Sequence, residues 1–115
     1  MATRALIAAS TKPLILSVLT HGENYGYHLI REIERLSEGE LAWTDAMLYP
    51  VLARMEKEGT IRSQWVQRDG GRKRKYYRIT DLGREQLTAE RDQWLNVNRV
   101  FLKLWGMGGD QYVPA

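Results

Sequence analysis

The chain has 115 residues, of which 43% are hydrophobic and 27% charged, and this composition is typical of one globular domain rather than of a disordered chain. The net charge is only +3, so the position of the cations is more informative than their sum. Cysteine is absent, which excludes disulfides and thiol chemistry, and no apolar run approaches the ~20 residues that span a bilayer. We therefore expect a soluble, cytoplasmic protein.

The first third of the sequence predicts two helices. An apolar run over 13–19 predicts the first, with Ser10 or Thr11 as its N-cap and Pro13 in its first turn. The second is predicted over about 25–36, because apolar residues recur there at helical spacing: Leu29, Ile30, Ile33 and Leu36. The run 41–43, which contains Trp43, is too short for a helix and is predicted to form a small strand.

A third helix is predicted to begin after Thr44 and to stop at Gly59. Thr44 is a good N-cap, and Asp45 suits the positive end of the helix dipole. The buried stripe consists of Leu48, Val51, Leu52 and Met55. Pro50 breaks the local rule, because it removes one backbone hydrogen bond inside the helix.

A cationic hairpin follows the third helix. Gly70-Gly71 separates the runs 61–67 and 76–80, which are rich in aromatic and β-branched residues and predict two strands. Six cations and one acid lie in the segment 68–78 around this turn. Such a tip can contact the phosphate backbone of DNA, although a solvated hairpin is the alternative when the loop is taken alone.

Three helices followed by a hairpin predict a winged helix-turn-helix over residues 1–80, a mainly α fold with a small β wing (α+β). In that architecture the third helix enters the major groove and the wing lies along the backbone or the minor groove. The candidate DNA-binding residues are therefore Thr44, Asp45, Met47, Tyr49 and Arg54 of the third helix and Arg72, Lys73, Arg74 and Lys75 of the wing. For Tyr49, the alternative is a partly buried aromatic ring with a solvated hydroxyl.

The last segment, 81–115, predicts one long helix, capped by Thr80 or Asp81 and ending near Trp105. Apolar residues recur along it at the spacing of a two-helix contact: Leu87, Trp94, Val97, Phe101 and Leu104. A second apolar stripe occupies another face, and one small domain cannot cover both. We therefore predict a homodimer built on this helix. In the alternative, the helix folds back onto its own domain.

Three segments resemble the PadR family of transcriptional regulators: 25–30 (Tyr-Gly-Tyr-His-Leu-Ile), 48–59 and 74–83. With one helix after the wing, the chain is similar to the compact subfamily that includes a multidrug-responsive repressor. The resemblance implies a dimeric repressor that binds a pseudo-palindromic DNA operator, and it adds Tyr25 to the candidate DNA-binding residues. Met47 and His28 depart from the usual pattern, where a small residue and an acid are common.

The resemblance also implies an effector pocket. Glu90 and Arg91 interrupt the apolar repeat one turn before Trp94, so a cavity could lie at the dimer axis. By similarity to the multidrug-responsive subfamily, Trp94 would stack on a planar aromatic or cationic molecule, and Ser17 and Asn98 would line the same pocket. In the competing interpretation, Trp94 is wedged into a closed interface.

Other classes of protein fit the sequence less well. It contains two histidines, and it has no nucleotide-binding loop, metal-ligand run or nucleophile motif, so we expect neither an enzyme nor a bound metal or other cofactor. A winged helix used only for protein contact would have an uncharged wing. A DNA-binding repressor without any small-molecule effector remains the alternative.

Overall fold

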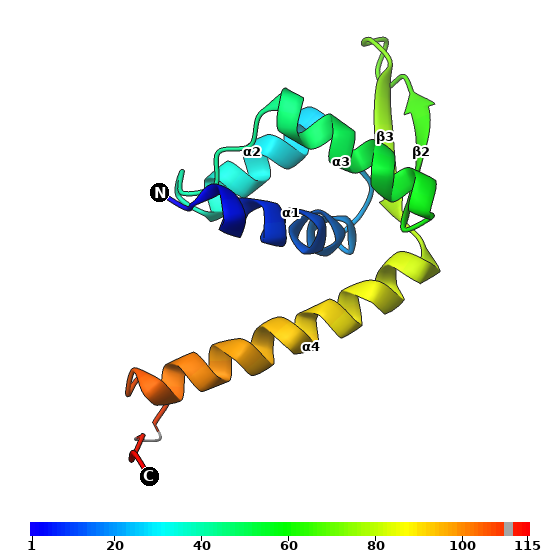
Figure 1. Cartoon of the computed structure of the whole chain (residues 1–115). Helices are drawn as coiled ribbons and strands as arrows, with labels where there is room; N and C mark the ends of the chain where they lie inside the picture. Colours follow the sequence, from blue (N-terminus) through cyan, green and yellow to red (C-terminus); the bar gives the residue numbers. More distant parts are fainter. Residues whose placement is uncertain (110–111) are drawn as a thin grey trace.

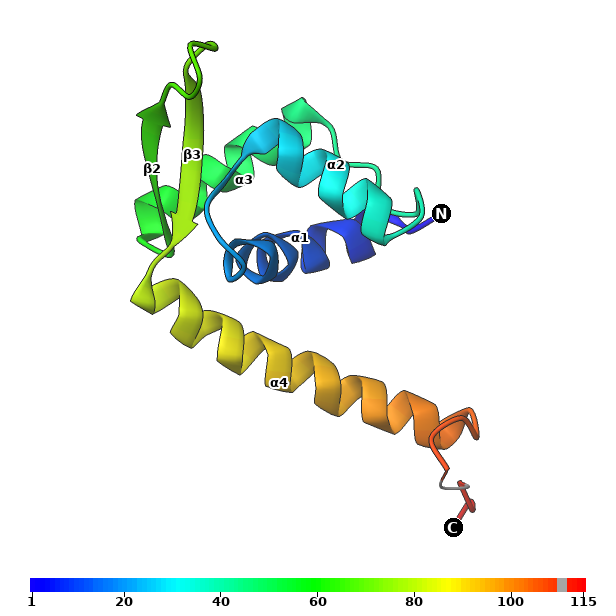
Figure 2. The same cartoon turned by 180° about the vertical axis from the view of Figure 1, so that it is seen from behind.

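The computed structural model describes residues 1–109 and 112–115, which form four α-helices and a three-stranded antiparallel sheet (Figure 1). The elements are α1 (Arg4–Leu19), β1 (Asn24–Tyr25), α2 (Gly26–Leu36), α3 (Asp45–Glu58), β2 (Ile61–Val66), β3 (Arg74–Ile79) and α4 (Asp81–Leu104). The predicted α+β fold with a β wing is confirmed. The β2–β3 hairpin, called the wing below, projects from one end of the three-helix unit, and α4 runs along the side away from α2 and α3 (Figures 1 and 2).

The core joins the three helices to the base of the wing. Its buried side chains come from α1 (Ile15, Leu16, Leu19), α2 (Leu29, Ile30, Ile33), α3 (Leu48, Leu52, Met55) and the strands (Ile61, Tyr77, Ile79). The stripe predicted for the third helix is thus largely buried. Leu36, which ends the predicted stripe of α2, is instead 60% exposed because the helix ends there.

The first helix is longer than the sequence predicted. It begins after Thr3, whose hydroxyl accepts a hydrogen bond from the Leu6 amide, and Pro13 lies in its interior. Ser10 and Thr11 are not caps; their hydroxyls donate to carbonyl groups one turn earlier. The alanine-rich segment before Pro13 extends the helix because alanine has the highest helix propensity.

The small strand is also in a different place. The segment 41–43 is not a strand, and Trp43 is a buried core residue. The strand that completes the three-stranded sheet beside the hairpin is instead β1. Its Asn24 and Tyr25 pair with Tyr77 and Tyr76 of β3. This pairing connects the start of α2 directly to the wing.

A tight junction connects α4 to the rest of the domain. The Thr80 hydroxyl caps α4 by accepting from the Gly83 amide, and it donates to the Gly59 carbonyl at 2.6 Å. A Cβ atom on Gly83 would lie 2.2 Å from the Thr60 carbonyl oxygen, so only glycine allows this approach. Beyond its first turns α4 is largely exposed, and within the described residues no helix is long and apolar enough to cross a bilayer.

Candidate nucleic-acid interface

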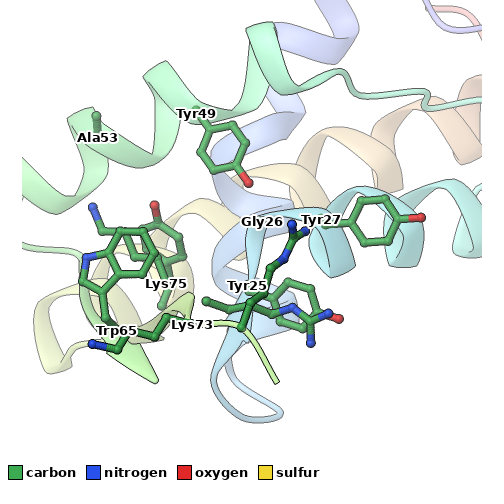
Figure 3. Close-up of a pocket in the computed structure, with 11 residues that line it drawn as sticks. Tyr25, Gly26, Tyr27, Tyr49, Ala53, Trp65, Lys73 and Lys75 are labelled. Atoms are coloured by element: carbon green, nitrogen blue, oxygen red, sulfur yellow. The ribbon is translucent and has the colours of Figure 1, made fainter. Parts of the chain in front are cut away.

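A groove of about 710 Å³ separates α3 from the wing and the start of α2 (Figure 3). Its lining combines cations and aromatic rings from three parts of the chain: Tyr25, Gly26, Tyr27, Tyr49, Ala53, Trp65, Arg72, Lys73, Arg74, Lys75 and Tyr77. We call it the wing groove. Cations attract phosphates, and aromatic rings supply flat contact surfaces, so this lining suits a nucleic acid.

The exposed face of α3 carries most of the residues that the sequence predicted for it. Thr44, Asp45, Tyr49 and Arg54 are all exposed. The Thr44 side chain accepts a hydrogen bond from the Met47 amide at 3.2 Å and so begins the helix as predicted. Met47 itself is half-buried and packs against the core, with its sulfur 3.9 Å from the Thr11 hydroxyl. It therefore lies at the border of the exposed face.

Tyr49 crosses from α3 to the start of α2. Its hydroxyl points toward the Gly26 and Tyr27 end of the wing groove in Figure 3. A Cβ atom on Gly26 would lie 2.5 Å from that hydroxyl oxygen, so glycine is what makes room for the ring. One signal in the sequence pointed to this role of Gly26, the Tyr-Gly-Tyr motif of residues 25–27, and nothing in the sequence predicted the contact with Tyr49.

The wing cations fall into two groups. Arg74 lies 4.6 Å above the Tyr25 ring, and the Lys75 ammonium lies 3.5 Å from the Glu56 carboxylate. Within the described part of the chain, no ion pair or ring contact is recorded for Arg72 or Lys73. The two cations at the tip are therefore the ones whose charge is most available to a partner.

Glu56 and Tyr77 hold the wing against α3. The Glu56 carboxylate accepts a hydrogen bond from the Ser63 hydroxyl at 2.5 Å in addition to pairing with Lys75. Burial of Tyr77, reinforced by Glu56 and Tyr49, raises the pKa of its phenol to about 12. The phenol therefore stays neutral beside the carboxylate.

A second, mostly apolar crevice of about 380 Å³ lies between α1 and α4. Its lining is Leu6, Ser10, Pro13, Leu14, Ser17, Leu41, Leu87, Arg91 and Trp94. The structure thus brings the predicted pocket residues Ser17 and Trp94 together, whereas Asn98 is not among the lining residues. Arg91 is the only charged side chain in this described lining.

The residues predicted for the dimer interface also differ in their surroundings. Leu87 packs partly against the core of its own domain. Trp94, Val97, Phe101 and Leu104 are 39–55% exposed, and the Phe101 ring stacks on Trp105 with the ring centroids 4.8 Å apart. The outer half of α4 therefore presents an apolar surface to solvent.

An exposed helix face beside a cationic wing defines a winged-helix DNA-binding protein. Residues 15–89 match the family described as transcriptional regulator PadR-like. The chain belongs to this family of DNA-binding transcriptional regulators, which are not enzymes. The predicted resemblance to the PadR family and the prediction that the protein is not an enzyme are therefore confirmed.

Individual relatives are similar to most of this chain. Protein X of Lysinibacillus sphaericus is 32% identical over 95 residues, which are 83% of this chain and 87% of that protein. Transcriptional regulator YqjI of Escherichia coli is 31% identical over 88 residues, but these cover 75% of this chain and only 36% of that protein.

Solved structures show the same similarity. A PadR-like transcriptional regulator from Bacillus cereus has a TM-score of 0.79 at 32% identity, with 88% of this chain and 96% of that chain covered. A transcriptional regulator from Clostridium thermocellum has a TM-score of 0.77 at 29% identity, with 87% and 97% covered.

Proposed function

We propose that the protein is a dimeric repressor whose two wing grooves bind the half-sites of a pseudo-palindromic operator. The observation that carries this proposal is the wing groove, where Tyr49 and Ala53 of α3 and the cations of the wing line one depression. Thr44, Asp45 and Arg54 are exposed on the same helix or at its N-cap but do not line the groove. Cations provide affinity for any duplex, whereas side chains of the third helix provide the choice of sequence.

Each side chain has a distinct role in this proposal. Arg54 can donate to a guanine edge, and Asp45 can accept from a cytosine amino group. Tyr25, Thr44 and Tyr49 offer hydroxyl groups to phosphates or bases. The expected phosphate contacts come from the wing, chiefly from Arg72 and Lys73.

Dimerisation through α4 is supported by its uncovered apolar residues. Contiguous exposed apolar surface of this kind marks interaction sites. A twofold axis along α4 would let the same residues on two copies cover each other: Trp94, Val97, Phe101 and Leu104. It would also place two recognition helices on one face of a duplex.

We further propose that the α1–α4 crevice binds a planar aromatic effector that stacks on Trp94. The apolar lining suits the ring, and Arg91 favours an anionic substituent over the cationic one that the resemblance alone would allow. Such a molecule derepresses only if it binds the DNA-incompetent dimer more tightly than the competent one. Asn98 lies four residues beyond Trp94 and does not line the crevice. It would contact the ligand only if the bound molecule extends to the dimer axis.

Footprinting and ligand titration test the two parts separately. The wild type should protect two half-sites about one or more helical turns apart, and a single asymmetric footprint would contradict the dimeric repressor. Trp94→Ala should lose binding of aromatic carboxylates, whereas Trp105→Ala, which lies outside the crevice, should retain it. If both variants bind every ligand like the wild type, Trp94 only packs.

A further inference from the structure

We propose that five residues form a clamp that sets the angle of the wing relative to α3, rather than binding DNA through their charges. They are Glu23, Tyr25, Arg68, Arg74 and Tyr76, and we call them the wing clamp. This inference rests on the proposed function, because it concerns how the wing is held in position for the operator.

The clamp is a continuous chain of contacts that joins the segment just before α2 to the wing. On the wing it reaches both ends of the loop between β2 and β3, residues 67–73. Glu23 accepts an ion-paired hydrogen bond from the Arg68 guanidinium, which lies 4.7 Å above the Tyr76 ring. Tyr76 meets Tyr25 edge to face, with the ring centroids 5.3 Å apart and the planes at 68°. Arg74 then covers Tyr25 at 4.6 Å. Cations and rings thus alternate along the chain of contacts.

These distances are those of attractive contacts. A guanidinium within ~6 Å of a ring centroid is held by the ring quadrupole, and edge-to-face rings prefer centroid separations of ~4.5–7 Å. The backbone adds to them, because Tyr25 and Tyr76 are also paired residues of β1 and β3. A two-stranded hairpin has little stability of its own in water, so external contacts decide where it points.

The clamp explains why β1 exists although it has only two residues. Asn24 and Tyr25 bring the turn before α2 against β3, and Glu23 is then within reach of Arg68 on the loop side of the wing. On the other side, Glu56 holds Lys75 to α3. The wing is therefore held from two sides, while Arg72 and Lys73 remain at its tip.

A simpler interpretation makes Arg68 and Arg74 ordinary phosphate ligands, with Glu23 an incidental surface acid. The two interpretations predict opposite signs for Glu23→Gln. Removal of an incidental acid beside the DNA-binding surface should strengthen binding to any duplex, because phosphates repel carboxylates. Removal of a clamp residue should weaken binding to the operator, because the wing no longer holds its angle.

The test measures dissociation constants of Glu23→Gln for the operator and for an unrelated duplex at several salt concentrations. We expect operator binding to weaken about two- to fivefold, the range of one exposed ion pair, and unrelated DNA to bind at least as tightly as to the wild type. Glu34→Gln, which removes the same charge from an exposed site on α2, is the matched control and should not weaken operator binding. Operator binding by Glu23→Gln that equals or exceeds that of the wild type would overturn the clamp.

Hydrogen exchange of the free protein provides a second measurement that does not involve DNA. Glu23→Gln and Tyr76→Leu should raise the exchange of wing amides over residues 61–79 but not of α1 amides, and Tyr76→Phe, which keeps the ring, should restore protection. Unchanged wing exchange in both variants would overturn the clamp. If instead the double variant Arg72→Ala/Lys73→Ala leaves the salt dependence of DNA binding unchanged, the wing does not contact phosphates and the proposed function is wrong, whatever the exchange shows.

Discussion

Replacement of Gly83 by alanine should destabilise the protein, although helix propensity alone predicts the opposite. Gly83 lies in the first turn of α4, where alanine would be favoured by up to ~1 kcal/mol. The added Cβ atom, however, would lie 2.2 Å from the Thr60 carbonyl oxygen and 2.8 Å from Ile79 Cγ1. Both distances are well short of ordinary contact, and the first neighbour is backbone, which cannot rotate away.

Overpacking of this kind costs roughly 1–3 kcal/mol, and we expect the upper part of that range, about 2–3 kcal/mol, because the nearest neighbour is backbone. Subtracting the propensity gain of up to ~1 kcal/mol leaves a net loss of about 1–2 kcal/mol. That loss should lower the Tm by roughly 5 °C or more in a domain of this size. The assay is urea or thermal unfolding at one fixed protein concentration, because dimerisation would make the midpoint concentration-dependent. Ala89→Gly, at an exposed position of the same helix, measures the propensity term separately. A Gly83→Ala variant as stable as the wild type or more stable would refute the close approach.

Three further changes test the dimer, the groove and the buried phenol. Phe101→Asp should place two uncompensated charges near the proposed axis, so sedimentation should give 13.3 kDa rather than twice that mass, and operator binding should be lost. Gly26→Ala should push the Tyr49 ring aside and weaken operator binding, measured by anisotropy, while the unfolding midpoint changes little. The loss should be at least as large as that of Tyr49→Phe, for which we expect ~0.5–1.5 kcal/mol. The unfolded phenol of Tyr77 has a pKa of 10.0 and the folded one a pKa of about 12, so stability should fall as the pH rises from 10 toward 12, and Tyr77→Phe should fall less.

Local signals in the sequence were sufficient for α3 and for the wing. Thr44 and Gly59 cap the helix at its two ends, and each acts through the backbone of its own turn, with Gly59 at a φ of 84°. The Gly70-Gly71 turn between two β-forming runs predicted the hairpin for the same reason. Caps and turns involve neighbours in the sequence, so a single chain reveals them.

Other features depend on partners that are distant in the sequence. β1 consists of two residues and is a strand only because Tyr76 and Tyr77 lie beside it. Gly26 is required by Tyr49, and Glu56 becomes part of the site through Ser63 and Lys75. No periodicity or cap in either partner's own segment indicates such contacts.

The site predictions divide along the same line. The sequence was sufficient to predict which residues of the third helix are exposed and where the cations of the wing tip lie. The sequence did not predict that the wing cations fall into two groups. Arg74 lies over the Tyr25 ring, whereas Lys73 has no ion pair or ring contact among the described residues. This grouping depends on where a ring from another element lies.

The close junction at Gly83 fixes one end of α4, so a change in the tilt of this helix moves its other end. A helix of 24 residues is about 36 Å long, so a tilt of about 5° at one end displaces the other by about 3 Å. That displacement is close to the rise of ~3.4 Å per base pair. If the outer ends of two such helices meet at the dimer axis, a tilt of about 5° in both helices would change the half-site spacing by up to about 6 Å, or about two base pairs. The length of α4 would then determine how far a given tilt moves the two recognition helices apart. Lengthening or shortening this helix should therefore change the half-site spacing that the dimer can bind.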